Sequence, residues 1–240
     1  MKPSIRVGTS GWNYLHWKGV FYPEKHPKSK WLEYYCGHFD TVELNASFYR
    51  QPKPTTFENW SKRTPGNFLW SVIANRYITH VKRLKDTEEP LKRFYDSATA
   101  LGPKLGVILF QLPPSLAYDR GLVGEFLEKL NLAYRHAIEA RNPSWITEEF
   151  FKQLEERNVS FCISDTAGRY PLHEEVTADY VYIRLHGSKK LYASLYTKKE
   201  VKEWAQKILK WNRDTFVYFD NDFEGNAVRN AHMLKDVLGT

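Results

Sequence analysis

The chain has 240 residues, of which 42% are hydrophobic and 26% charged, and its formal net charge is +7. This composition allows one sizeable core, and the absence of any run of about 20 apolar residues excludes a membrane-spanning helix. Two cysteines, both within apolar patterns, favour reduced core thiols over a disulfide framework. Because no apolar leader precedes the first predicted strand, we expect a soluble, cytoplasmic protein.

The first half of the chain alternates between predicted strands and helices. Strands are predicted at residues 5–10, within 40–52, at 68–74 and at 106–112. Helices are predicted from an N-cap at Ser29 to a stop at Gly37, at 55–63, and from a cap at Thr87 to a stop at Gly102-Pro103. Each predicted strand carries polar residues at its C-terminal end.

The second half repeats this pattern. Strands are predicted at residues 136–141, 159–165, 180–187 and 215–222. A weak helix is expected around 121–130, another from Thr147, one from a Thr197/Glu200 capping box, and a last one carrying Ala231, Leu234 and Leu238. The capping-box helix is expected to bury Val201, Trp204, Ala205, Ile208 and Leu209. Residues 166–177 fit either a loop or a short helix.

Eight strands alternating with about eight helices predict an α/β fold, a single-domain (β/α)8 barrel of the TIM type over residues 1–240. A doubly wound open sheet is the alternative. The first strand is not followed by G-x-G-x-x-G, and the chain has no P-loop, so the usual nucleotide-binding turn is missing. No Ser-, Gly- or Pro-rich linker divides the chain.

Seven sequence blocks occur in a characteristic order. They are G-T-S-G-W-N-Y at 8–14, T-V-E-L-N-A-S-F-Y at 41–49, I-T-H at 78–80, F-Q-L-P-P at 110–114, E-A-R-N-P-S-W at 139–145, Y-I-R-L-H-G at 182–187 and N-D-F-E-G-N-A-V-R-N-A at 221–231. With these blocks the chain resembles the YecE-like family, domain of unknown function 72. The resemblance implies a TIM-type barrel and no established activity. Members often carry a lysine in the third strand where this chain has Ile73, so a mechanism using that lysine is not expected here.

Catalytic groups of such barrels lie at the C-terminal ends of the strands, and this rule selects the candidate site. Catalytic roles are predicted for Glu43, Glu139, Asp165 and His186. Substrate binding is predicted for Trp12, Asn45, Tyr49, His80, Gln111, Arg141, Arg184 and Asn221. Because charged groups near a barrel mouth are costly unless paired, this set indicates either a ligand site or an ion-pair network.

The residue types leave the chemistry open. Three carboxylates and a histidine suit a divalent metal, although no metal-binding spacing signature is present and the cofactor stays undefined. Without a metal, two carboxylates could act as general acid and base. Arg141 and Arg184 suit an anionic substrate, or one of them only neutralises Glu139. Aromatic residues near the strand ends could stack on a sugar or a base.

The leading hypothesis is therefore an enzyme, a hydrolase, lyase or isomerase, that acts on a small polar, anionic or sugar-like molecule. Two other hypotheses are kept. The net charge of +7 would suit a protein that binds or processes nucleic acid. A non-catalytic ligand-binding protein would use the same mouth. The sequence defines no oligomeric state.

Overall fold

Eight parallel strands form one sheet in a computed structural model that describes residues 3–240, and their order is β1-β8-β7-β6-β5-β4-β3-β2. The strands are β1 Ile5–Thr9, β2 Thr41–Leu44, β3 Leu69–Ile73, β4 Leu105–Gln111, β5 Arg135–Glu139, β6 Ser160–Asp165, β7 Tyr180–Leu185 and β8 Asp214–Phe219. Because β1 pairs with β8, the sheet curls into a nearly closed barrel. The prediction of a single (β/α)8 barrel fold is confirmed.

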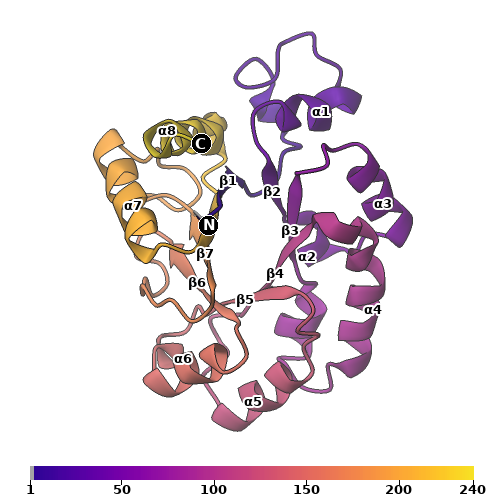
Figure 1. Ribbon diagram of the computed structural model, residues 1–240, viewed down its shortest axis with the longest axis vertical. Helices are drawn as coiled ribbons and strands as arrows, with labels where there is room; N and C mark the ends of the chain where they lie inside the picture. The colour runs from indigo at the N-terminus through magenta and orange to yellow at the C-terminus, as the bar shows by residue number, and fades with distance from the viewer. Residues whose placement is uncertain (1–2) are drawn as a thin grey trace.

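Helices form an outer ring around the strands (Figure 1). The α-helices are α1 Trp31–Cys36, α2 Ala46–Tyr49, α3 Pro54–Lys62, α4 Glu88–Ala98, α5 Arg120–Glu128, α6 Glu148–Glu155, α7 Lys198–Trp211 and α8 Asn226–Leu238. Short 3-10 turns are η1 Leu15–Trp17, η2 Lys28–Lys30, η4 Thr99–Lys104, η5 Pro143–Trp145 and η6 Phe223–Gly225, and η3 Tyr77–Val81 is a π-helix. The segment 166–177 contains neither helix nor strand, so it is a loop.

The ends of the helices test the predicted caps. Thr197 and Glu200 form the predicted capping box of α7, and the Thr147 hydroxyl caps α6. The predicted cap at Ser29 is wrong, because Ser29 belongs to the turn η2 and α1 begins two residues later. Thr87 stands at the N-cap of α4, but its buried hydroxyl makes no hydrogen bond to any residue from 3 to 240.

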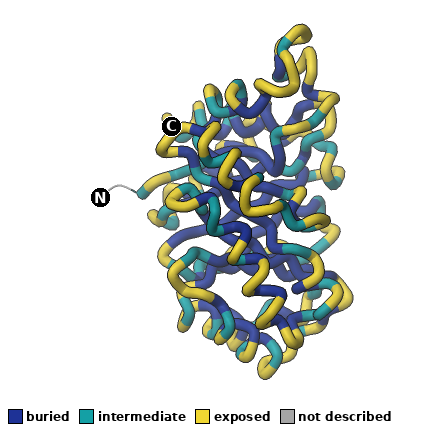
Figure 2. Tube along the Cα trace, turned by 90° about the vertical axis from the view of Figure 1, so that its right-hand side faces the viewer, coloured by how far each residue is buried: buried dark blue, intermediate teal, exposed yellow. Residues whose placement is uncertain are grey.

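Apolar side chains form two layers, one on each side of the sheet. The larger core lies between strands and helices, and a smaller one fills the barrel interior with residues such as Leu109, Cys162 and Tyr218. Figure 2 shows the buried trace inside an exposed outer surface. Leu209, expected in the buried stripe of α7, is 55% exposed, because at 100° per residue it lies at the edge of the face formed by Val201, Trp204, Ala205 and Ile208. Both cysteines are free.

The barrel is completed between β1 and β2, where only one isolated bridge, Ser10 to Glu43, joins the two strands in the described residues. The Tyr35 hydroxyl of α1 spans this seam, because it accepts from Thr9 N (3.0 Å) and contacts Thr41 O (3.1 Å). A Cβ at Gly8 would lie 2.4 Å from Thr41 O, so only glycine allows this close approach.

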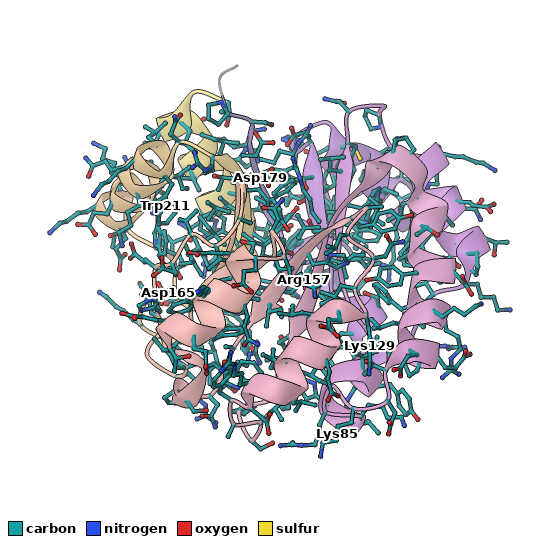
Figure 3. The ribbon with its side chains drawn as sticks, turned by 60° about the horizontal axis from the view of Figure 1, so that its bottom comes forward. Lys85, Lys129, Arg157, Asp165, Asp179 and Trp211 are labelled. Atoms are coloured by element: carbon teal, nitrogen blue, oxygen red, sulfur yellow. The ribbon has the colours of Figure 1, made fainter. Side chains whose placement is uncertain are left out.

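The loops after the strands gather at one end of the barrel. Figure 3 places Lys85, which precedes α4, at the bottom of the view, and Trp211, which ends α7, in the upper part. Because all eight strands are parallel, the residues that follow strands and precede helices share one end of the barrel, as the candidate site requires. None of the helices within residues 3–240 has both the length and the apolar character to cross a membrane.

Candidate functional site

Arg184 at the end of β7 is the centre of a buried ion network. Its Nε and Nη2 donate to Glu43 Oε1 (3.1 and 2.8 Å), and Nη2 also donates to Asp220 Oδ2 (3.1 Å). Its Nη1 donates to Glu139 Oε2 (2.6 Å) and to Gln111 Oε1 (3.3 Å). These contacts use all five N–H groups of a guanidinium. Arg184 therefore has no donor left for a ligand.

Glu43 and Glu139 are fully buried partners of that network. The second carboxylate oxygen of Glu43 accepts from the Tyr182 hydroxyl (2.7 Å), and that of Glu139 accepts from Arg141 Nε (2.7 Å). Burial alone would raise the pKa of Glu139, but Arg141 and Arg184 outweigh it and hold that pKa well below its usual value. All four oxygens are occupied, so these two residues support the site rather than contact a ligand.

Arg141, which follows β5, keeps free donors. Its Nε donates to Glu139, its Nη2 donates to Gln111 Oε1 (2.7 Å), and its guanidinium lies 4.8 Å from the centre of the Tyr170 ring. Three of its five N–H groups have no partner within residues 3–240. Because Arg141 also lines a cavity, it is the cation that can bind a ligand there.

That cavity, of about 240 Å³, opens at the C-terminal ends of the strands. Its polar wall comes from several strand ends and loops: Asn45, Gln111, Arg141, Arg184, Asp220 and Asp222. Its aromatic wall consists of Tyr14, Phe48, Tyr49 and Tyr192. Ile73 of β3 also lines it, so the third-strand position at which the resemblance implied a lysine faces the cavity and is apolar here.

Asp220 and Asp222, directly after β8, place two carboxylates with opposed pKa shifts on this cavity. Burial raises the pKa of Asp220, but His186 and Arg184 outweigh it, and the pKa lies below its usual value. Burial and the neighbouring charge of Asp220 raise the pKa of Asp222. At a pH between the two pKa values, the residue with the lowered pKa is ionised and the one with the raised pKa is protonated.

Asp220 and Asp222 were not among the predicted site residues, although the sequence carried a signal for them. Side chains of a strand alternate between two faces, so 220 and 222 share one face and Asn221 takes the other. Asn221 is buried away from the cavity, where its Nδ2 donates to Ser194 O (2.8 Å) and Asn230 Oδ1 (3.0 Å). It ties the end of β8 to α8 and to the loop before α7.

His186 and Asp165 lie behind the cavity wall. His186 is fully buried, and its Nδ1 is 2.9 Å from Asp220 Oδ2 without hydrogen-bond geometry. Arg184 and His186 thus approach the same carboxylate oxygen, as expected for residues on one face of β7. Asp165 accepts from the Tyr196 hydroxyl (3.0 Å) and Ala167 N (3.2 Å), and burial raises its pKa.

The remaining predicted residues surround the cavity. Tyr49 is 74% exposed at its rim, and Asn45 Nδ2 donates to the Tyr14 hydroxyl (2.8 Å) in its wall. Trp12 lies in an adjacent cavity, where it packs edge-on against Trp60 (5.5 Å between ring centres). The structure therefore brings most predicted residues to one barrel end but divides them between the cavity, its support and a neighbouring cavity.

His80, on the π-helix, packs edge-on against Phe48 of the cavity wall (5.0 Å between ring centres). Burial, followed by the charges of Arg76 and Arg141, lowers its pKa to about 4. We expect an NMR titration of the His80 ring to have its midpoint near pH 4, so that His80 is neutral at pH 6. Arg76→Gln should raise this midpoint, since Arg76 gives the largest charge contribution. A wild-type midpoint near pH 6.5, the value of an exposed histidine, would contradict the burial of the His80 ring against Phe48.

No group of three His, Cys, Asp or Glu side chains converges as a set of metal ligands in the part of the chain that the structure describes. Glu43 and Glu139 are instead bound to arginines. The tetrad proposed from sequence, Glu43, Glu139, Asp165 and His186, is therefore divided between the network around Arg184 and the pair formed by Asp165 and Tyr196.

The fold and the site define a TIM-type barrel with a buried ion network under a small polar cavity. Residues 6–240 match the family described as "Protein of unknown function DUF72", and the chain belongs to that family. It is 27% identical to UPF0759 protein YunF of Bacillus subtilis over 278 aligned positions, covering 98% of this chain and 94% of that protein.

Two further similarities agree with this family. UPF0759 protein YecE of Escherichia coli K12 is 23% identical over 239 positions, covering 89% of this chain and 84% of that protein. A crystal structure of a DUF72 family protein from Thermotoga maritima superimposes with a TM-score of 0.88 at 32% identity, covering 99% of this chain and 100% of that one. The resemblance drawn from the seven sequence blocks is confirmed.

Proposed function

We propose that this protein is an enzyme that performs general acid–base chemistry on a small hydroxylated or anionic molecule in the cavity at the strand ends. The observation that carries the proposal is the pair Asp220 and Asp222, whose pKa values are shifted in opposite directions on one cavity. Asp220 would take a proton as the base, and Asp222 would give one as the acid. Hydrolysis, elimination and isomerisation each need one group that removes a proton and one that donates a proton.

The rest of the cavity supports a small polar substrate. Arg141 offers free N–H groups to a carboxylate, a phosphate or a hydroxyl. Tyr14 and Tyr192 have pKa values raised chiefly by burial, so their phenols stay neutral. The volume of about 240 Å³ is below the roughly 300–1,000 Å³ of sites for drug-sized ligands, which favours a molecule the size of a monosaccharide.

The charge of the site does not favour the nucleic-acid hypothesis. The charged residues in the lining of the cavity are two arginines, Arg141 and Arg184, and two aspartates, Asp220 and Asp222. Because these charges balance, the cavity offers no extended positive surface to a polyanion. The positive net charge of the chain lies outside this cavity.

A turnover screen tests the proposal. Wild-type protein is incubated in deuterium oxide with monosaccharides, sugar acids and sugar phosphates, and mass spectrometry and NMR follow bond cleavage, isomerisation and deuterium uptake. We expect one compound class to react, and Asp220→Asn to slow that reaction by at least about 100-fold through loss of the base. Asp236→Asn, on the exposed face of α8, is the control and should retain activity. Equal turnover by wild type and Asp220→Asn, or none by either, would refute the proposal.

A further inference from the structure

A second cavity, of about 330 Å³, lies beside the first at the same barrel end. Its floor includes Gly11, after β1, and Leu44, which ends β2. Tyr14 and Asn45 line both cavities. Their side chains are joined by a hydrogen bond of 2.8 Å, and the Tyr14 hydroxyl also donates to Ser10 O (2.7 Å). A fixed pair of side chains therefore separates two cavities that one molecule could occupy together.

The two cavities differ in charge. The second has Lys28 and Arg63 and no Asp or Glu among its lining residues, whereas in the first Arg141 and Arg184 are balanced by Asp220 and Asp222. Arg63 is held in place because its Nε and Nη2 donate to Glu33 (both 2.9 Å) and Nη2 donates to Ser29 O (2.7 Å). Its Nη1 has no partner within the described residues.

The second cavity also has aromatic rings in its lining. Trp12 and Trp60 line the second cavity and are half-buried, with Trp12 also packed edge-on against Trp70 (5.1 Å). Lys28 carries its ammonium group 5.7 Å from the Trp31 ring, on the exposed turn η2, and no acidic side chain pairs with it in the region described. A cation beside indole rings suits an anionic group attached to a sugar or another ring.

We propose that the second cavity is a subsite for the anionic group, a phosphate or a carboxylate, of a substrate whose reacting part occupies the first cavity. The substrate class is then an anionic sugar or a related hydroxylated ring. This inference rests on the proposed function for the reacting part, but its binding step does not depend on turnover. It explains why the predicted ligand residue Trp12 lies outside the first cavity.

Binding of defined probes tests the subsite. Calorimetry is carried out at low salt with glucose, glucose 6-phosphate, glucuronate and inorganic phosphate. We expect glucose 6-phosphate or glucuronate to bind at least about tenfold more tightly than glucose, because charge-assisted contacts add to those of the ring. Whichever probe binds more tightly identifies the anionic group. If neither binds more tightly than glucose, or if the preference is for inorganic phosphate alone, the subsite proposal is overturned.

Two matched variants localise the effect. Lys28→Gln should lower the affinity for the more tightly bound anionic probe about tenfold and leave the affinity for glucose unchanged, since one cation is lost. Lys30→Gln removes an equivalent charge from the same turn, outside the lining of the cavity, and should change neither. Equal effects of the two variants would mean that only general surface charge attracts the probe, which also overturns the proposal.

The turnover screen separates this inference from the proposed function. Asp236→Asn should bind the anionic probe within about twofold of wild type, because Asp236 is exposed on α8 and lines neither cavity. If the probe binds through Lys28 but nothing is turned over, the subsite stands and the enzymatic proposal fails. If turnover depends on Asp220 but Lys28→Gln changes no affinity, the enzyme stands and the subsite fails.

Discussion

Replacing Arg184 with methionine is expected to lower the free energy of unfolding by about 3–5 kcal/mol, the usual cost of leaving buried charges without their partner. Arg184 contacts Glu43, Glu139 and Asp220 at 2.6–3.1 Å, and the first two carboxylates are fully buried. Methionine has a similar size but none of the five donors. The loss is measured by urea unfolding at pH 7, with Arg120→Met on the exposed surface as the control.

The pH dependence of this loss provides a sharper test. In the wild type the pKa values of Glu139 and Asp220 are lowered, so their stabilisation is present above their unfolded-state pKa values and decreases as the pH falls. Without Arg184, burial dominates and should raise the pKa of the carboxylates that lost their partner. Acid then favours the folded variant by protonating them.

The difference in stability between wild type and Arg184→Met should therefore shrink between pH 7 and pH 5. A difference that stays constant over this range, or one no larger than that of Arg120→Met, would show that the network around Arg184 contributes little. Circular dichroism of each variant at pH 7 establishes that the unfolding curves start from the folded state.

The barrel could be predicted from sequence because its signals are local. Each strand is marked by a short apolar run, and each helix by its own apolar face or capping residue. Eight such strand–helix units in succession predict the architecture. The same logic placed Glu43, Glu139 and Arg184 at one barrel end, where the structure brings them within hydrogen-bonding distance. Strand ends of a parallel barrel converge whatever the exact register of each strand.

The roles within the site could not be predicted in this way. Arg141 and Arg184 look equivalent in the sequence, yet among the residues that the structure describes Arg141 leaves three N–H groups without a partner and Arg184 leaves none. That distinction depends on side-chain positions from four other strands. Tyr170, which packs against Arg141, comes from a loop without any periodic pattern. Asp220 and Asp222 could have been predicted, because side chains of a strand alternate between its two faces and this places both aspartates on the face opposite to Asn221.

Replacing Asp222 with asparagine is expected to reduce kcat by about 10²–10⁴-fold on the substrate found by the turnover screen, the range for loss of a general acid. The carboxyl group is the proton donor in the proposed reaction, and its raised pKa keeps it protonated to higher pH than an ordinary aspartate. Asparagine keeps the size of the side chain but has no proton to transfer.

The pH profile of kcat/KM distinguishes this role from a structural one. In the wild type the rate should fall as the pH drops through the lowered pKa of Asp220, which protonates the base. It should also fall as the pH rises through the raised pKa of Asp222, which removes the acid. Asp222→Asn should lose only the alkaline limb. An alkaline limb that persists unchanged in this variant would assign the acid to another group.

The two aspartates are also coupled, and the coupling predicts a shift that neither residue would produce alone. The charge of Asp220 helps to raise the pKa of Asp222. In Asp220→Asn that charge is gone, so the alkaline limb of the residual activity should move to lower pH. A residual profile whose alkaline limb stays in place would mean that Asp222 does not titrate as the acid, even if both variants are slow. A shift to lower pH would tie both carboxylates to one reaction in one cavity.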